Sequence, residues 1–529
     1  MGEIKLLDCT LRDGGYVNDW NFGHDNLISI FERVIGAGTD IIEVGFLDER
    51  RPFDINRSIM PDTESVSKIW GNLDKKETMV LGMIDYGTCS LENIQPCESS
   101  YLDGIRVIFK KHLREQAIEF CGKLKALGYK VFAQLVSITS YNDEELLDLV
   151  RLANEVKPYA VSIVDTYGLL HQDTLMHYFT VLNDNLDLSI SLGYHSHNNF
   201  QLGYANCIEM LSHSVERDVL VDATIYGMGK SAGNTPIELL SMHLNEHYGK
   251  NYQISQFLEA IDANIMNIYR QTPWGYNMFY YVAAANDCHP NYVSYLMEKR
   301  TLSVKAINEI LAKIEGEKKL LYDEDCIEAL YVDYQAIDID DKMYYDELGK
   351  ELKYMDVLLL GTGPNLNKQI DVVTNYINEY NPIVISINFI PEHVKTDFVF
   401  LSNSKRYVQL ATALATHQGE VKVIATSNVT KTSGKFDYTL NYSDLLDYKA
   451  EIADNSIAML LQVLIRLNAN KVALAGFDGY KGNAKNYIHT NMEYDFGEEK
   501  ANKHNKYMST VLKEISKHIQ LTFITDTLY

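Results

Sequence analysis

Two polar clusters, each following an apolar run, contain residue types that can bind a metal ion. The first includes Arg12 and Asp13, and the second includes His195 and His197. Side chains two residues apart in a β-strand point to the same face, so both imidazoles are expected to face the same side. Histidine and carboxylate ligands suit Mg²⁺, Mn²⁺, Fe²⁺ or Zn²⁺, and the spacing does not choose among these ions.

The alternative interpretation is that each histidine is a buried core residue held by hydrogen bonds, and for a lone histidine this alternative is favoured. A His-x-His pattern at a strand end, combined with an Arg-Asp pair, favours a metal site instead. We therefore predict Asp13, His195 and His197 as metal ligands. A glycine-rich segment at residues 227–234 ends in Asn234, which we predict as a further oxygen ligand.

Short apolar runs alternate with helix-like stretches through the first part of the chain. Near-continuous Val, Ile and Leu is typical of parallel strands that are buried on both faces. Eight such runs match the strand count of a (β/α)₈ TIM barrel, and a doubly wound open sheet is the alternative. Helices are expected between the runs, for example at residues 25–36, 113–127 and 143–155. The expected strands are residues 4–9, 41–47, 80–85, 104–109, 131–137, 160–165, 190–197 and 221–228.

A closed barrel explains how the two polar clusters meet. Strands one and seven of such a barrel are separated only by strand eight, and spacings of ~4.8 Å put them about 10 Å apart. The carboxylate of Asp13 can bridge that gap and share a cation with the two imidazoles. The fold and the candidate site therefore support each other.

The whole-chain composition limits the classes of function. A length of 529 residues is too great for one hydrophobic core and predicts at least two domains. The formal net charge of −24 argues against nucleic-acid and anionic-membrane binding, because phosphate contacts need clusters of Lys and Arg. Seven scattered cysteines without a CxxC pair, together with the lack of a long apolar segment, favour a cytoplasmic protein. An anionic substrate would need a local cation.

Three domains are expected along the chain. Residues 1–240 form the barrel, and residues 241–350, which look helical and carry many aromatic side chains, form a cap and linker or an oligomer face. Residues 351–529 alternate strands and helices again, which predicts a smaller, open, Rossmann-like α/β domain. The strands expected in this last domain are residues 357–360, 383–387, 398–401, 421–425, 471–475 and 521–524.

A Gly-x-Gly turn follows the first strand of the last domain. Gly361 and Gly363 precede Asn365 and a helix start, where backbone N–H groups can hold a phosphate. A tight structural turn explains the same pattern equally well. We predict a nucleotide-binding loop that includes Gly361, Gly363 and Asn365.

Six short motifs occur in one order within residues 3–290. Their order resembles the pyruvate carboxyltransferase-like metallolyase superfamily, which includes hydroxymethylglutaryl-CoA lyase, and looks most like its 4-hydroxy-2-oxovalerate aldolases. The motifs are residues 10–14 (Thr-Leu-Arg-Asp-Gly), 43–45 (Glu-Val-Gly), 165–166 (Asp-Thr), 195–198 (His-Ser-His-Asn), 202–206 (Leu-Gly-Tyr-Ala-Asn) and 227–234 (Gly-Met-Gly-Lys-Ser-Ala-Gly-Asn).

This resemblance implies a divalent metal cofactor, Mn²⁺ or Mg²⁺, and roles for individual residues. The segment around Tyr276, followed by an aromatic helix, looks like the one that supplies the active-site tyrosine of those aldolases. The implied metal ligands are Asp13, His195, His197 and, as in some members only, Asn234. The implied cation that steadies an enolate oxygen is Arg12.

One position departs from the aldolase pattern. Those aldolases place a catalytic histidine three residues beyond the aspartate, and this chain has Tyr16 there. A phenol with an ordinary pKa near ~10 is a poor base at neutral pH. Either Tyr16 serves as acid or base, or it only shapes the pocket while a metal-bound water or a cap residue such as His289 acts as the base.

The resemblance implies an aldolase that cleaves or forms a C–C bond of a 4-hydroxy-2-oxo acid through a pyruvate-type enolate, with an aldehyde as the second product. An acetyl-CoA-dependent Claisen acyltransferase on the same barrel is the first alternative. A homo-oligomer is also expected.

The last domain loosely resembles CMP-sialyltransferase-like domains over about residues 355–529. The resemblance is carried by the Gly-x-Gly-Pro turn, by a Gly-Phe-Asp-Gly-Tyr run at residues 476–480, and by Tyr487 and His504. It implies that Tyr480 and Tyr487 contact a phosphate and that His504 acts as a base. A nucleotide or nucleotide sugar is therefore the expected ligand, and a glycosyltransferase that the barrel merely feeds or scaffolds is a further alternative.

Overall fold

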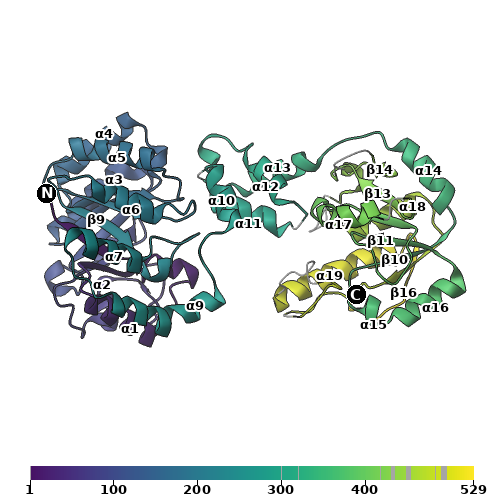
Figure 1. The fold of residues 1–529 in the computed structure, drawn as a ribbon, viewed down its shortest axis with the longest axis horizontal. Helices are drawn as coiled ribbons and strands as arrows, with labels where there is room; N and C mark the ends of the chain where they lie inside the picture. Colours follow the sequence, from purple (N-terminus) through teal and green to yellow (C-terminus); the bar gives the residue numbers. More distant parts are fainter. Residues whose placement is uncertain are drawn as a thin grey trace. The chain divides into compact units, whose positions relative to one another are not determined.

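The computed structural model describes residues 2–299, 301–319, 321–416, 419–429, 435–447, 454–482, 484–489 and 497–529 (Figure 1). The chain divides into two compact units, which we describe separately. The barrel unit contains Met1–Val293 and Gly316–Leu321, and the second unit contains Ser294–Glu315 and Tyr322–Tyr529. The division falls inside residues 241–350, the segment that the sequence predicts as cap and linker.

Eight parallel strands close into a barrel, as the sequence predicts. Strand β1 pairs with β9 on one side and with β2 on the other, which closes the ring. A two-residue strand, β3 (Ile59–Met60), adds to β2 outside the ring. The barrel strands are β1 (Ile4–Asp8), β2 (Ile41–Leu47), β4 (Met79–Asp85), β5 (Gly104–Phe109), β6 (Lys130–Leu135), β7 (Ala160–Asp165), β8 (Ser191–Ser196) and β9 (Val219–Ala223).

Helices follow the strands and bury apolar faces against the barrel. Helix α4 shows why they start where they do: Asn142 accepts the N–H of Glu145, whose side chain in turn accepts the N–H of Asn142. The helices of this unit include α1 (His24–Gly36), α2 (Thr63–Trp70), α3 (Arg114–Ala126), α4 (Asp143–Val156), α5 (Gln172–Asn185), α6 (Gly203–Ser212), α7 (Ile237–Tyr248), α8 (Ile254–Ala260), α9 (Met266–Gln271) and α10 (Met278–Ala285).

The last barrel strand differs from the prediction. Strand β9 ends at Ala223, and Ile225–Gly227 forms a short 3-10 turn in which Tyr226 has a φ of 55°. The apolar run from Val221 to Met228 therefore contains a strand end and a turn, because Met228 is buried by the loop rather than by strand pairing.

The second unit contains an open, seven-stranded parallel sheet. Its strand order is β14-β13-β12-β11-β10-β15-β16, and the order reverses between β10 and β15. Strand β14 is not predicted from the sequence, because three residues are too few to show a pattern. The strands are β10 (Asp356–Leu360), β11 (Ile383–Ile387), β12 (Phe398–Leu401), β13 (Lys422–Thr426), β14 (Tyr438–Leu440), β15 (Lys471–Ala475) and β16 (Gln520–Phe523).

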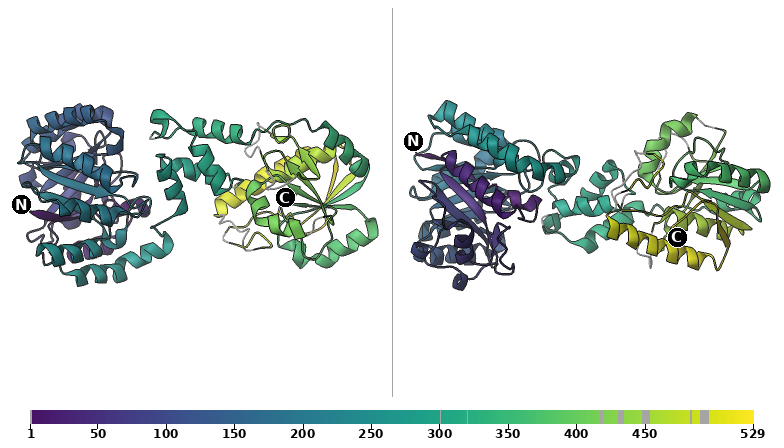
Figure 2. Two further views of the ribbon diagram at one scale, coloured as in Figure 1. Left: turned by 45° about the horizontal axis from the view of Figure 1, so that its top comes forward. Right: turned by 90° about the horizontal axis from the view of Figure 1, so that it is seen from below.

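Helices cover both faces of this sheet (Figure 2). Three of them, α14 (Lys342–Leu352), α18 (Ser456–Arg466) and α19 (Glu498–Ile515), pack on one face. On the other face lie α15 (Asn365–Lys368), α16 (Ile370–Tyr380) and α17 (Ser404–Thr416). None of the helices in the described ranges combines the length and apolarity needed to cross a membrane.

Candidate active site and metal centre

The barrel brings the three predicted metal ligands together. Asp13 follows β1, His195 lies in β8 and His197 follows β8, and only β9 separates these strands. One Asp13 oxygen lies 3.8 Å from His195 Nε2, and the other lies 3.5 Å from His197 Nε2. All three side chains are buried. This spacing leaves room for one cation between the three groups.

Each imidazole directs the lone pair of its Nε2 toward the space between Asp13, His195 and His197. Nδ1 of His197 lies 2.9 Å from the carbonyl oxygen of Asp165, which can only accept a hydrogen bond, so this nitrogen carries the proton. Nδ1 of His195 lies 2.9 Å from Asp222 Oδ2 in the same way. Nε2 of His197 is buried and has no hydrogen-bond partner in the part of the chain that the structure describes. An acceptor orphaned beside a carboxylate is what a bound metal ion would satisfy.

Charges keep these ligands in the forms that bind metal. Burial lowers the pKa of His195, so its ring is neutral at pH 7. Burial alone would raise the pKa of Asp13, but the Arg12 guanidinium holds it well below its usual range. The site therefore offers one carboxylate, the neutral imidazole of His195 and the Nε2 atom of His197.

Asn234 fits as a fourth ligand through its side-chain oxygen. Among the described residues its buried Oδ1 has no hydrogen-bond partner, and its amide nitrogen lies 3.3 Å from His195 Nε2. A Cβ at Gly229 would lie 1.7 Å from Asn234 Oδ1 and 2.7 Å from Asp13 Oδ2. Glycine at position 229 thus lets the loop approach the carboxylate, and the donor set suits a divalent ion.

A ring of buried charges positions the ligands. Arg12 pairs with Asp13 and, through Nε at 2.7 Å, with Glu43. Arg106 pairs with Glu43 at 3.2 Å and with Asp222, which holds His195. Sequence reasoning missed the roles of Arg106 and Asp222. Their only signal was a single charged residue inside an otherwise apolar strand.

A second cluster of potential ligands, Cys9, His195 and Asp222, also lies in the barrel. Burial raises the pKa of the Cys9 thiol well above its usual value, so the thiol is protonated. Asp222 is already engaged by Arg106. This cluster therefore lacks the ionised sulfur that a metal would need.

Tyr16 lies beside the metal ligands but is not a base. Its ring packs edge-on against Trp20, with centroids 4.8 Å apart, and contacts Phe46. Burial around the hydroxyl raises the pKa of Tyr16 to about 12, although the side chain as a whole is 41% exposed. The phenol is therefore protonated at neutral pH and can donate its O–H to a substrate oxygen. A cavity of about 210 Å³ lies next to these rings, and its lining includes Tyr16, Trp20, Phe46 and Asp85.

The two other candidates for acid–base roles are placed differently. Nδ1 of His289 accepts the N–H of Asn291 at 3.1 Å, and burial lowers the pKa of His289 to about 4. Its ring is therefore neutral and a weak base. Tyr276 is 63% exposed, and in the described part of the chain the structure gives it no hydrogen bond to a metal ligand. Its catalytic role stays a prediction.

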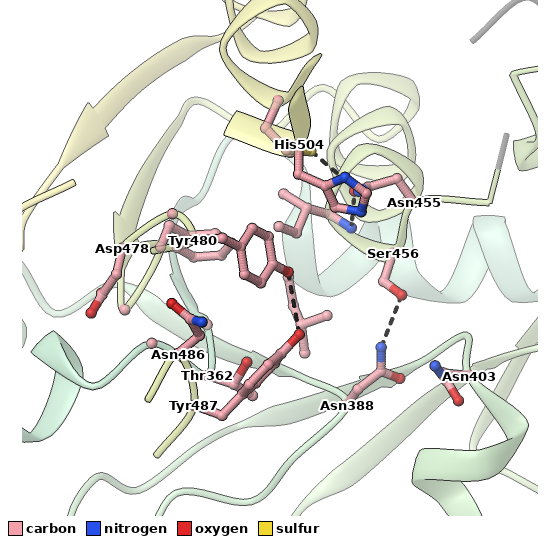
Figure 3. Close-up of a pocket in the computed structure, with 18 of the residues that line it drawn as sticks. Thr362, Asn388, Asn403, Asn455, Ser456, Asp478, Tyr480, Asn486, Tyr487 and His504 are labelled. Atoms are coloured by element: carbon pink, nitrogen blue, oxygen red, sulfur yellow. Dashed lines mark hydrogen bonds between the residues drawn. The ribbon is translucent and has the colours of Figure 1, made fainter. Parts of the chain in front are cut away.

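A second cavity, of about 230 Å³, lies in the second unit at the carboxyl ends of β10, β11 and β15 (Figure 3). Tyr480 and Tyr487 face each other across it with hydroxyls 3.4 Å apart, and the His504 ring lies 5.8 Å from that of Tyr480. Asparagine and serine side chains that sequence reasoning missed complete the polar lining. Of the predicted residues, the structure places Gly361, Gly363, Tyr480, Tyr487 and His504 around this cavity.

Asn365 is placed differently from the prediction. It does not line the cavity; its N–H donates to Asp478 at 2.7 Å and its side-chain amide to the carbonyl of Asp526 at 3.0 Å. Asn365 therefore holds the loop in place. A Cβ at Gly363 would lie 2.4 Å from Asp478 Oδ1, so only glycine fits this turn.

The fold and the site together define a (β/α)₈-barrel protein with a candidate metal centre at the carboxyl ends of its strands. Residues 3–263, which contain all eight barrel strands, match the HMGL-like family. The family resemblance and the barrel fold predicted from the sequence are thus confirmed.

Several relatives with a named activity align with this chain. A 4-hydroxy-2-oxovalerate aldolase from Marinomonas sp. is 24% identical over 250 residues, which cover 46% of this chain and 71% of the relative. Another from Pelotomaculum thermopropionicum is 26% identical over 264 residues, or 49% and 74% of the two chains. An oxaloacetate decarboxylase from Mycobacterium tuberculosis is 26% identical over 253 residues, or 45% and 69%.

Solved structures show the same likeness at lower identity. The N-terminal domain of a Bacteroides vulgatus protein proposed to be an aldolase is 23% identical, with a TM-score of 0.48, and the match covers 58% of this chain and 99% of that domain.

Proposed function

We propose that the barrel unit is a divalent-metal-dependent lyase that cleaves or forms the C3–C4 bond of a 4-hydroxy-2-oxo acid, with pyruvate and an aldehyde as the other partners. The observation that carries the proposal is the group of Asp13, His195 and His197, with its orphaned imidazole nitrogen. The HMGL-like family and the relatives named as aldolases support the same reaction class.

Asp13, His195, His197 and Asn234 would hold the metal, with Mn²⁺ or Mg²⁺ as the proposed ion. When bound, such an ion supplies Lewis acidity toward the oxygens of a 2-oxo acid. Arg12 would stabilise the negative charge that develops on the enolate oxygen. Its Nε and Nη1 are held by Glu43 and Asp13, so the guanidinium is oriented before substrate arrives.

Cleavage transfers the C4-hydroxyl proton by way of solvent to C3 of the enolate, and condensation returns it. The protonated phenol of Tyr16 would donate a hydrogen bond to the aldehyde oxygen. Replacing Tyr16 with phenylalanine is expected to lower kcat about 10²-fold, because one positioned donor is lost. Since the pKa of Tyr16 is raised to about 12, this hydroxyl should contribute no change in rate between pH 6 and 9. A coupled assay for pyruvate measures both quantities. An unchanged kcat in the variant would leave Tyr16 as a wall of the pocket only.

The reaction class is tested by measuring pyruvate release from hydroxylated 2-oxo acids, including sugar-derived ones, with Mn²⁺, with Mg²⁺ and with a chelator. Metal-dependent pyruvate release supports the aldolase. Release of free thiol from acetyl-CoA in the presence of 2-oxo acids, without pyruvate release, would favour a Claisen acyltransferase on the same barrel.

We also propose that the second unit binds a nucleotide or nucleotide sugar. The supporting observation is the polar cavity at the point where the strand order reverses, where open parallel sheets commonly bind ligands. Two tyrosine rings offer stacking surfaces, and Arg406 lies over the ring of Tyr487 at 5.6 Å.

Calorimetric titration of the whole chain with CMP and other nucleotides, in a chelator that empties the barrel site, tests this proposal. Replacing Tyr487 with phenylalanine should weaken binding about 10-fold, since one hydrogen bond is lost. Replacing Tyr380 with phenylalanine, an exposed tyrosine on α16, is the matched control and should change nothing. Absence of heat at millimolar nucleotide would refute the proposal.

A further inference from the structure

Lys230, at the mouth of the barrel, has a backbone that hydrogen bonds hold in place. Its side-chain charge is paired with no carboxylate of the described residues. Its N–H donates to Asp13 Oδ2 at 3.2 Å, and its carbonyl accepts the N–H of Gly233 at 2.9 Å. The loop is pinned further by Ala232, whose N–H donates to Asn199 Oδ1 at 3.1 Å. The backbone of Lys230 is therefore held against a metal ligand.

The other buried cations near the metal ligands are already paired. Arg12 is shared by Asp13 and Glu43, and Arg106 is shared by Glu43 and Asp222. Three carboxylates thus face two guanidinium groups. Within the described residues the structure gives Lys230 no ion pair, and its Nζ lies 5.5 Å from the centre of the Tyr16 ring.

A half-buried ammonium group without a carboxylate is unfavourable unless something else supplies negative charge. The face of Tyr16 offers only a weak cation–π contact and no hydrogen-bond acceptor for the three N–H groups. The carboxylates of Asp13, Glu43 and Asp222 are paired by the two arginines, so the ammonium group of Lys230 can pair with an anionic group of a substrate.

We propose that Lys230 is the residue that binds the carboxylate of the 2-oxo acid and so selects anionic substrates. This inference rests on the proposed function of the barrel. It assigns the substrate's two charges to different groups: Arg12 faces the oxygen that becomes the enolate, and Lys230 faces the carboxylate. The formal net charge of −24 repels an anion, and a cation at the mouth of the barrel offsets that repulsion.

The test uses oxamate, an uncleavable analogue of a 2-oxo acid, and oxamide, which lacks the carboxylate. Both are titrated by calorimetry into the Mn²⁺-loaded protein and into chelator-treated protein. Lys230→Met keeps the apolar stem and removes the charge, Lys230→Arg keeps the charge, and Lys123→Met, at an exposed lysine on α3, is the matched control. Mn²⁺ binding and thermal melting of each variant are measured alongside, and Lys230→Gln serves if the methionine variant does not fold.

Lys230→Met is expected to weaken oxamate binding about 10- to 100-fold, because a charge-assisted hydrogen bond is lost. Oxamide binding should stay unchanged, Lys230→Arg should recover most of the oxamate affinity, and KM for the 2-oxo acid should rise more than kcat falls. The inference fails if wild-type protein does not bind oxamate or if Lys230→Met binds oxamate as tightly as wild type does. It also fails if Lys230→Met loses the same factor of affinity for oxamate and for oxamide.

These outcomes separate the inference from the proposed function. Oxamate binding that depends on Lys230, in a protein that releases no pyruvate from any 2-oxo acid, would uphold Lys230 and overturn the aldolase. Pyruvate release with a KM that is unaffected by Lys230→Met would uphold the aldolase and overturn the role of Lys230.

Discussion

Replacing His195 with alanine is expected to abolish Mn²⁺ binding and to lower metal-dependent pyruvate release by a factor on the order of 10³ or more. The substitution removes one of three converging ligand groups and leaves Asp13 and His197 alone at the site. It also leaves Asp222 without the imidazole that it orients. Mn²⁺ binding followed by calorimetry and pyruvate release followed by a coupled assay give independent readouts.

Two companion variants make this prediction specific. Asp13→Asn keeps the size of the side chain but removes the carboxylate charge, and it should lose Mn²⁺ binding as well. His177→Ala removes an exposed histidine that pairs with Asp143 on the outside of the barrel, and it should leave both readouts at the wild-type level. Metal-dependent pyruvate release that survived either site variant would show that the ligand assignment is wrong.

Replacing Arg106 with methionine is expected to destabilise the barrel by about 3–5 kcal/mol at pH 8, the cost of leaving buried carboxylates without their cation. Arg106 is fully buried and bonds Glu43, Gln134 and Asp222. Methionine fills much of the volume but compensates neither carboxylate. Urea unfolding, followed by circular dichroism, measures the loss.

The pH dependence of this loss follows from the sign of the pKa shifts. In the native chain burial acts to raise the pKa of Asp222, but Arg106 and His195 hold it below the usual value, so its contribution is present above the unfolded-state pKa and lost in acid. Without Arg106 burial would dominate and raise that pKa. The folded variant would then bind a proton more readily than the unfolded chain, and its deficit should be smaller at pH 5 than at pH 8.

An exposed arginine provides the control for this experiment. Arg151→Met breaks surface pairs with Asp148 and Glu155 and should leave the free energy of unfolding nearly unchanged. Because Asp222 orients His195, Arg106→Met should also weaken Mn²⁺ binding about 10- to 100-fold. A stability loss at pH 8 as small as that of Arg151→Met would mean that the buried charges do not depend on Arg106.

Much of the barrel could be predicted from the sequence because its strands are buried on both faces and are therefore continuous apolar runs. This explains why β2, β5 and β7 match their predicted bounds. The same signal failed beyond Ala223, where the buried Met228 belongs to a loop. It also failed at β14 (Tyr438–Leu440), which is too short to carry a pattern.

The candidate site, too, could be predicted from the sequence only in part. The sequence alone determined the donor types, since a His-x-His pattern and an Arg-Asp pair at strand ends are local features. Tertiary structure alone decided which nitrogen of each imidazole faces Asp13, because that choice depends on Asp165 and Asp222 from other strands.

Long-range packing also determined the chemistry of residues whose identity the sequence shows plainly. Arg106 meets Asp222 across 116 residues of chain. Within the described ranges Lys230 makes no ion pair, and Asp13, Glu43 and Asp222 pair with the two arginines instead. Burial, not residue type, raises the pKa of Tyr16 to about 12 and makes it a donor. Composition and spacing thus determined which groups are present at the barrel mouth. Only the folded arrangement decided their protonation and pairing, because both depend on desolvation and on charges brought close by distant segments.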